Sequence, residues 1–213
     1  ANSTYDGCVE GNSTWLGDFE RDTKNYAHSL NTILDFTLSE KSSLSLSANL
    51  NFTPKNDSDL NGRTDIYDPS EALDSFFTTD SRLENEGKNM LFNADYSTSL
   101  GENGTTLSAQ ANYIRFDENQ DQDLNTTYFS GGGNEITNNT ILTQGFQNSD
   151  IYTGQVDITA NMGSLPVETG IKYSGITSNS SLDFYDSLLD QADDLSDALD
   201  YDENIYAAYF STS

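Results

Sequence analysis

The stretch SLSLSANLNFT, residues 43–53, decides the fold class, because apolar and polar side chains alternate in it without interruption. Leu44, Leu46 and Leu50 fall on one phase, while serine and asparagine fill the other. A period of two is that of a β-strand whose two faces differ in polarity. Residues 30–38 alternate in the same way, and the short segment 39–42 joins the two runs. Such a pair predicts an antiparallel hairpin.

Two further hairpins and one more strand follow along the chain. Residues 90–100 alternate and lead through the glycine-rich turn 101–104 into a second alternating run, and residues 152–162 do the same through the turn 163–166. A last strand begins near Glu203. The strands that we predict, about seven in all, lie near residues 29–53, 89–116, 151–177 and 203–211.

The segments between the hairpins predict long loops. They span residues 54–88, 117–150 and 178–202, far beyond the usual length of a connection between strands. In an up-and-down arrangement, consecutive connections lie at opposite ends, so all short turns share one end and all long loops the other. We expect residues 1–28 to be a further loop at the long-loop end.

Two loop segments have the signature of short helices. Asp68, Pro69 and Glu71 supply an N-cap, a proline in the first turn and an acidic residue before an apolar run. Residues 185–199 place leucines and a tyrosine at helical spacing among aspartates, which predicts an amphipathic helix over the loop end.

Composition excludes several classes of protein. Nine basic residues stand against 35 acidic ones in 213, a net charge of -26, which opposes nucleic-acid binding through phosphate neutralisation. Hydrophobic residues make up only 34%, and no run approaches the roughly 18 apolar residues of a transmembrane helix. The single cysteine, Cys8, excludes a disulfide framework within the chain. No linker divides the chain, so residues 1–213 are treated as one unit.

The placement of charge favours lipid over water as the solvent of the apolar face. Asp35, Asp95, Asp157 and Lys172 all fall on the polar phase. The predicted strands have about 10 to 12 residues, near the number that crosses a bilayer when tilted. On the apolar phase, aromatic residues end the strands at the long-loop side, as in an interfacial girdle; they are Phe52, Tyr113, Tyr152 and Tyr173. The sequence therefore predicts an antiparallel up-and-down transmembrane β-barrel segment, with a soluble β-sandwich as the rival.

Several strings resemble outer-membrane β-barrels of the TonB-dependent receptor type. They are LDFTLSEKSSLSLSANLNF (34–52), NADYSTSLGENGTTLSAQANY (93–113), VETGIKYS (167–174) and DENIYAAY (202–209). The resemblance covers most of residues 26–213 and rests on strand patterns rather than catalytic motifs. It implies location in the outer membrane of a Gram-negative bacterium. The implied function is part of a receptor that binds a metal chelate, oligosaccharide or peptide at its extracellular loops and imports it.

The sequence departs from that family because it carries no recognisable plug and no energy-coupling box, and it has too few strands to close a family-sized barrel. The resemblance therefore implies a barrel segment whose partners are the remaining strands and plug of a parent protein, a TonB-type energy-coupling complex and a surface lipoprotein. Outer-membrane lipid and lipopolysaccharide are expected partners as well. The alternative is a non-transporting surface barrel, an adhesin or scaffold whose acidic loops bind a partner.

The best metal-ligand candidates are Asp117, Asn119, Asp121 and Asp123, whose alternating oxygen-bearing side chains match the start of a calcium-binding loop. The match is partial, since Gln122 and Tyr128 stand where such a loop needs glycine and glutamate. No other cofactor is expected.

An enzyme is not expected. The one histidine, His28, has no nucleophile or base beside it in the sequence, and Cys8 has no nearby base either. Trp15 suits packing within a loop better than stacking on a sugar. The run Gly131 to Gly133 predicts a loop tip rather than a phosphate-binding turn, because no strand-to-helix pattern surrounds it.

Overall fold

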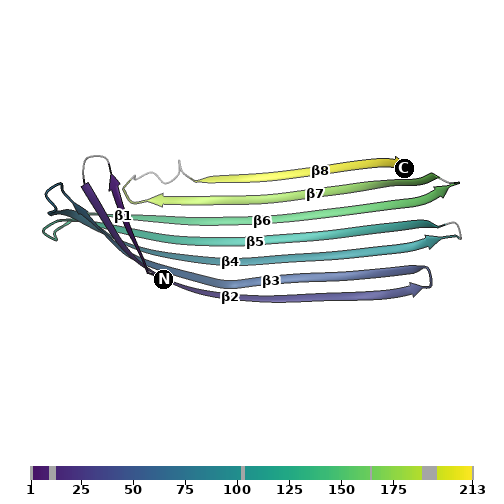
Figure 1. Ribbon diagram of the computed structural model, residues 1–213, viewed down its shortest axis with the longest axis horizontal. Helices are drawn as coiled ribbons and strands as arrows, with labels where there is room; N and C mark the ends of the chain where they lie inside the picture. Colours follow the sequence, from purple (N-terminus) through teal and green to yellow (C-terminus); the bar gives the residue numbers. More distant parts are fainter. Residues whose placement is uncertain (1, 10–12, 102–103, 164, 189–195, 213) are drawn as a thin grey trace.

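A computed structural model describes residues 2–9, 13–101, 104–163, 165–188 and 196–212 as a single antiparallel sheet (Figure 1). Its strands follow the order of the chain, β1 to β8, so each strand pairs with its neighbours in sequence. The bounds are β1 Asn2–Val9, β2 Ser13–Ser39, β3 Ser42–Tyr67, β4 Leu73–Leu100, β5 Thr105–Ser130, β6 Glu135–Met162, β7 Leu165–Asp186 and β8 Asp197–Thr212.

The register fixes which residues share a face. Strands β4 and β5 pair without a break from Ser75 opposite Ser130 to Leu100 opposite Thr105. On β3, an irregularity between Thr53 and Asn56 inserts a bulge against both neighbouring strands. A bulge of this kind bends a strand while the pairing continues on either side of it.

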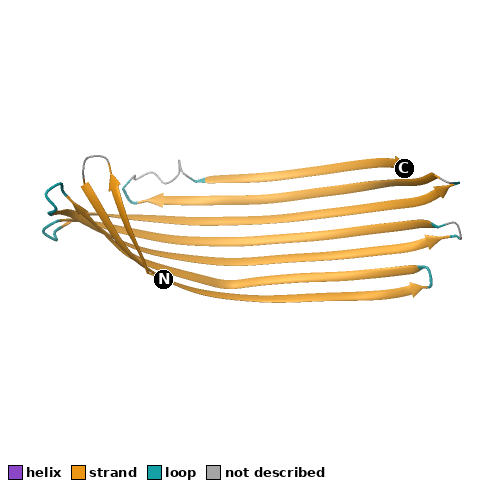
Figure 2. Cartoon of the chain, viewed as in Figure 1, coloured by secondary structure: helices purple, strands orange, loops and turns teal. Residues whose placement is uncertain are grey.

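The described segments apart from the short turns are all strands (Figure 2), and each described strand contacts only its neighbours in the sheet, so they form a single layer. Among the described residues no hydrophobic side chain is buried, and the one buried polar side chain is Thr64. A soluble domain of this length buries a large apolar core on folding. The described residues form no helix of the length and apolarity needed to cross a membrane.

The strands are much longer than the sequence patterns predicted. β2 to β6 have 26 to 28 residues each, a length of roughly 90 Å at about 3.3 Å per residue. The predicted long loops are therefore wrong: residues 54–88 and 117–150 are mostly strand, joined by short turns at 68–72 and 131–134. The predicted loop 1–28 is likewise wrong, since it contains β1 and the first part of β2.

The expected helix after Asp68 is a tight turn. The Asp68 carboxylate accepts hydrogen bonds from the backbone N–H groups of Ser70 (2.8 Å) and Ala72 (3.0 Å). The Ser70 hydroxyl donates to the same carboxylate, and this bond is the main reason that the pKa of Asp68 lies below its usual range. The two backbone bonds lower the pKa further. The cap satisfies one turn only, because Glu71 has a φ of 63° and the chain enters β4 at Leu73. Pairing with β3 and β5 overrides the local helix signal.

Of the second expected helix, residues 185–199, the central part 189–195 lies outside the described residues. Of its two ends, Tyr185 lies on β7 and Leu199 on β8, so both are in strands. The structure has eight strands where about seven were predicted, and the sheet is open as described, with β1 and β8 at its edges.

Candidate functional site

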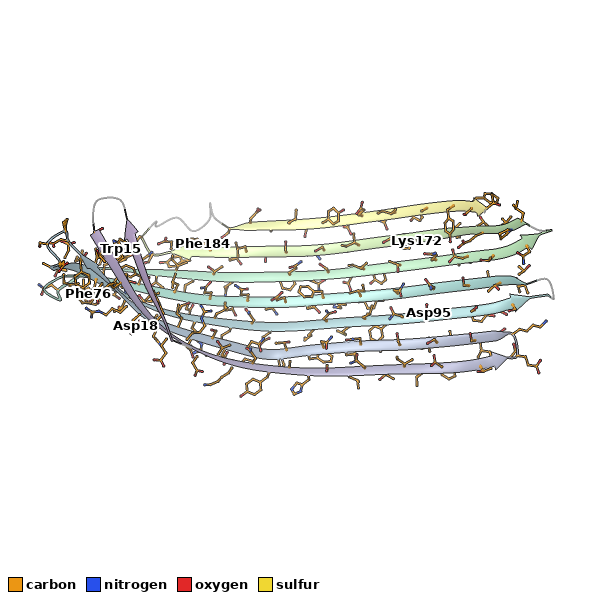
Figure 3. All side chains as sticks on the ribbon, viewed as in Figure 1. Trp15, Asp18, Phe76, Asp95, Lys172 and Phe184 are labelled. Atoms are coloured by element: carbon orange, nitrogen blue, oxygen red, sulfur yellow. The ribbon has the colours of Figure 1, made fainter. Side chains whose placement is uncertain are left out.

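Two parts of each long strand differ in the chemistry of their faces. We call residues 29–53, 89–101, 104–116, 151–163, 165–177 and 203–212 the turn-side half, because it adjoins the short connections from β2 to β3, from β4 to β5 and from β6 to β7. Residues 13–28, 54–88, 117–150, 178–188 and 196–202 form the distal half. Figure 3 shows Asp95 and Lys172 in the turn-side half, and Trp15, Asp18 and Phe76 toward the opposite end of the sheet.

One face of the turn-side half is an uninterrupted apolar band. Register places alternate residues of β2 to β8 in rows across the sheet, and these rows consist of leucine, alanine, valine, isoleucine and aromatic residues. Two neighbouring rows are Phe36, Leu44, Tyr96, Ala109, Val156, Ile171, Ala208 and Leu34, Leu46, Ala94, Ala111, Gly154, Tyr173, Tyr206. Ile171 is 62% exposed and Tyr206 77%. The stripe predicted from alternation is thus one continuous surface.

Aromatic residues border this band on its distal side. Tyr113 stacks on Tyr152 with ring centroids 4.8 Å apart, and Phe92 lies 6.2 Å from Tyr113. The rings of Tyr173 and Tyr206 also lie side by side, tilted by 40° with centroids 5.1 Å apart. The predicted girdle residues therefore lie along one edge of the apolar band, and Tyr206 extends the line to β8.

The aromatic border runs obliquely across the strands. Phe52 is in register with Asp117, four residues beyond Tyr113 on β5, and Tyr152 is in register with Gly175, two beyond Tyr173 on β7. From β3 to β8 the border thus drops by six residues, roughly 20 Å along the strands over roughly 24 Å across them. This slope of roughly 40° equals the strand tilt of membrane barrels, so the border is level when the strands are tilted.

The opposite face of the turn-side half is polar and hydrogen-bonded across strands. Asn93 Nδ2 donates to Ser47 Oγ (2.9 Å), and Asn112 Nδ2 donates to Thr153 Oγ1 (2.8 Å). The predicted polar-phase charges Asp35, Asp95, Asp157 and Lys172 all fall on this face. A face of this kind needs water or polar partners, so it does not suit hydrocarbon.

In the distal half, the face that continues the apolar band is charged. Arg115 Nε donates to the Asp117 carboxylate at 2.9 Å, and Arg82 lies 2.5 Å from Glu84. All the ion pairs found among the described residues lie on this face, from the band's edge outward. Further acidic side chains on it are Asp18, Glu20, Asp22, Asp59, Asp80, Glu86, Asp121, Asp123 and Asp183. Charged side chains at this density require contact with water, so this face is solvated.

The other face of the distal half carries aromatic rings and few charges. Trp15 meets Phe77 edge to face at 6.1 Å, and Phe77 lies 5.6 Å from Tyr128. Hydroxyl side chains lie beside them: Trp15 Nε1 donates to Ser13 Oγ (3.3 Å), and Thr64 is in register with Phe77. We call Trp15, Phe77 and Tyr128 the aromatic cluster. Trp15, which was expected in a loop, lies on β2, and strand pairing brings it to Phe77 and Tyr128 from distant parts of the sequence.

The four calcium candidates lie on β5, not in a loop. Asp117, Asn119, Asp121 and Asp123 alternate along one strand and point to one face, where successive side chains are roughly 7 Å apart. A calcium loop instead wraps its oxygens around one ion at about 2.4 Å. Within the described part of the chain, no three His, Cys, Asp or Glu side chains gather closely enough for a metal ion. The loop geometry is wrong, and calcium binding stays a prediction.

Asp117 has protein partners of its own. Arg115 holds it through two nitrogens, at 2.9 and 3.2 Å, and Asn148 Nδ2 donates to it as well. The hydrogen bond from Arg115 is the main reason that the pKa of Asp117 lies below its usual range. Arg115 lies at the band's border, where its ion pairs also include Asp150 at 3.7 Å.

The remaining candidates are far from one another. His28 lies on β2 opposite Phe52, whereas Cys8 lies on β1 opposite Thr14. Gly131 to Gly133 form the turn between β5 and β6, where Gly133 has a φ of 82° that favours glycine.

Comparison with known proteins gives one family. The model described as the outer membrane protein beta-barrel family matches residues 99–213, which contain the last strand residues of β4 and all of β5 to β8. No curated protein matches the chain.

Proposed function

The chain belongs to the outer membrane protein beta-barrel family of the bacterial outer membrane, and from this premise we propose that it forms part of the wall of a nutrient receptor of the TonB-dependent type. The observation that carries the proposal is the reversal of polarity between the two halves. The apolar band suits the bilayer, and the distal half extends well beyond the roughly 30 Å of hydrocarbon. The distal half then stands outside the cell, with its aromatic face toward the barrel interior.

Ligand capture is the role that we propose for the aromatic cluster. Trp15, Phe77 and Tyr128 present flat apolar surfaces among neutral hydrogen-bonding groups, a combination common in small-molecule sites. The acidic residues lie mainly on the other face, so a ligand meets little charge beside these rings. A metal chelate, an oligosaccharide and a peptide all offer matching surfaces.

The polar face of the turn-side half is the proposed conduit wall. In a membrane barrel the face opposite the lipid lines the lumen, and the cross-strand hydrogen bonds of Asn93 and Asn112 keep this wall hydrated and ordered. The proposal includes a plug, further strands and an inner-membrane energy-coupling complex as partners, together with a surface lipoprotein. It includes no catalytic step.

The experiment is a growth and uptake assay in the bacterium that carries the parent gene. Metal chelates, oligosaccharides and peptides are each made limiting, and Trp15→Ala is compared with Leu16→Ala, which changes the next residue on the opposite face. We expect Trp15→Ala to reduce uptake of one nutrient class about tenfold, in line with the loss of one aromatic contact in a binding site. Uptake should also stop when a protonophore removes the energy supply.

The acidic outer face supports a second candidate, a non-transporting surface barrel that binds a cationic partner. Asp18, Asp22, Asp59 and Asp80 lie on this face of the distal half. Deletion of the gene distinguishes the nutrient receptor from the non-transporting surface barrel. Normal uptake of all three nutrient classes, together with loss of surface adhesion, would contradict the receptor and support the adhesin.

A further inference from the structure

The first charged residue beyond the apolar band differs between the two sides of the sheet. On the band's face of β2, β3, β4 and β5 it is Lys24, Lys55, Lys88 and Arg115 respectively. On β6, β7 and β8 it is an acid, namely Asp150, Asp183 and Asp202. Four of the nine basic residues of the whole chain therefore lie along one border.

This placement is unexpected for so acidic a chain. Basic residues are 9 against 35 acidic ones, so about one charged position in five is basic. If basic and acidic residues were placed at random in that ratio, a run of four consecutive strands among β2 to β8 with a basic residue at the first charged position would have a chance of roughly one in 170. Charge composition alone therefore does not account for the row, which we call the cation row.

The cation row slopes in the same direction as the aromatic border, but more steeply. Arg115 is in register with Met90, two residues from Lys88, and Lys24 is in register with Asp57, two residues from Lys55. Each cation thus lies about two residues further from the turns than its neighbour toward β5, in all roughly 20 Å along the strands over roughly 14 Å across them. A strand tilt of about 40° therefore brings the row to within roughly 6 Å of one height above the band.

The height of the row corresponds to the lipid headgroups. It begins directly beyond Tyr113, and aromatic girdles mark the boundary between hydrocarbon and headgroups. The ammonium and guanidinium groups then face the phosphates of the leaflet on the distal side, which is the outer leaflet when the distal half is outside the cell.

The three lysines keep donors for such phosphates, whereas Arg115 already pairs with Asp117 and Asp150, so a phosphate has to compete for its guanidinium group. Lys24 and Lys88 form no salt bridge with any described residue. Lys55 lies 3.4 Å from Asp57 and 3.5 Å from Glu84, and its side chain is 45% exposed. Exposed ion pairs of this kind contribute little, so a phosphate can compete for the ammonium group. Asp57 is the main cause of the raised pKa of Lys55, which therefore remains charged.

We propose that the cation row on β2 to β5 binds the phosphate groups of an anionic glycolipid in the outer leaflet, and that the β6 to β8 side does not. The phosphates pair directly with Lys24, Lys55, Lys88 and Arg115, while the acyl chains lie along the apolar band below. The cation row recognises the charge of the lipid phosphates at the height of the headgroups. The lipid is therefore retained on the β2 to β5 side of the barrel.

The test uses the full chain in its native outer membrane, extracted in mild detergent, with bisphosphorylated lipid A as the probe and dephosphorylated lipid A as its control. The variant is Lys88→Gln with Arg115→Gln. Its matched control is Lys41→Gln with Lys172→Gln, which removes the same charge from the turn and the polar face. Binding is measured by titration, and the lipid retained per chain is counted by mass spectrometry.

We expect the cation-row variant to bind bisphosphorylated lipid A about 25-fold more weakly, since each basic residue near an anionic surface contributes about fivefold. The control pair should bind within about twofold of the unchanged chain. Binding should also weaken as salt rises, because exposed charges are screened. Charge-conserving Lys88→Arg with Arg115→Lys should restore most of the affinity, which separates loss of charge from loss of folding.

Three results would overturn the proposal. The first is equal binding of the cation-row variant and the unchanged chain. The second is equal binding of the phosphorylated and dephosphorylated lipid. The third is binding that disappears on chelation of divalent cations but is indifferent to Lys88 and Arg115, since the acidic residues would then hold the lipid through metal ions. None of these results bears on nutrient uptake, so the two proposals fail independently.

Discussion

The turn-side and distal halves of the sheet share the same strands and the same alternation, yet the chemistry of their faces is reversed. Along β5, the face that presents Ala109 and Ala111 in the turn-side half presents Asp121 and Asp123 in the distal half. The opposite face changes from Gln110 and Asn112 to Leu124 and Tyr128. The backbone is a β-strand in both halves, so strand geometry does not require the change of side chains. The difference in polarity reflects the solvent that each face contacts.

The largest expected effect comes from placing a charge in the apolar band. Ala109→Arg puts a guanidinium near the middle of the band, and we expect it to lower the free energy of unfolding in lipid by about 2–4 kcal/mol. Gln110→Arg, one residue away on the polar face and opposite Asp95, is the control and should be tolerated. Folding titrations in lipid vesicles measure the free energy of unfolding of both variants. Equal losses would contradict the assignment of one face to lipid and of the other to a polar environment.

A smaller effect is expected in the aromatic cluster of the distal half. Phe77→Ala removes ring contacts with both Trp15 and Tyr128, each contributing about 0.5–1.5 kcal/mol. We expect the distal half to become sensitive to protease while the turn-side half stays protected by lipid. Thr79→Ala, next on the same face, should leave the cleavage rate unchanged. Cleavage that spreads into the turn-side half would mean that the halves are not separable.

The aromatic border should contribute less. Tyr152→Leu keeps an apolar side chain but loses the stacking on Tyr113 and the polar tip at the boundary, for a cost of about 1 kcal/mol. Urea titration in vesicles measures it. Tyr185→Leu changes a tyrosine of the same face far out in the distal half, and should cost less. A larger loss at Tyr185 would place the lipid boundary elsewhere.

The smallest effect is the pH dependence of the Arg115–Asp117 pair. The pKa of folded Asp117 lies below its ordinary 3.8 because Arg115 stabilises the carboxylate. Its contribution to stability is therefore complete well above pH 3.8 and is lost as the pH falls below that value. The side chains of Arg115 and Asp117 are 38% and 21% exposed, so solvent screens their interaction and we expect an effect smaller than that of Tyr152→Leu. Asp117→Asn should remove this part of the acid sensitivity in a pH series of unfolding titrations, whereas Asp121→Asn should not.

Much of the turn-side half is predictable from sequence, because one face must be apolar along its whole length. Strict alternation at residues 43–53 gave the strand, the hairpin and the face of each side chain, and the register confirms them. The family match confirms a β-barrel of the bacterial outer membrane. The receptor type, the cargo and the calcium site stay predictions.

The distal strands were missed although their sequence also has a period of two. Charges fall on alternate residues at Lys55, Asp57 and Asp59, and again at Arg82, Glu84 and Glu86. Alternation of charged with neutral residues is the same strand signal as alternation of apolar with polar ones. We interpreted these segments as loops because neither phase is consistently apolar.

The sequence by itself determined the strands near the turns, the apolar band and the excess of acid, because each follows from residue type and a period of two. Only the tertiary structure decided how far the strands continue and which distant residues share a border. The aromatic border and the cation row each draw residues from several strands, and their slope depends on register. Register comes from pairing along whole strands, which no single segment of sequence contains.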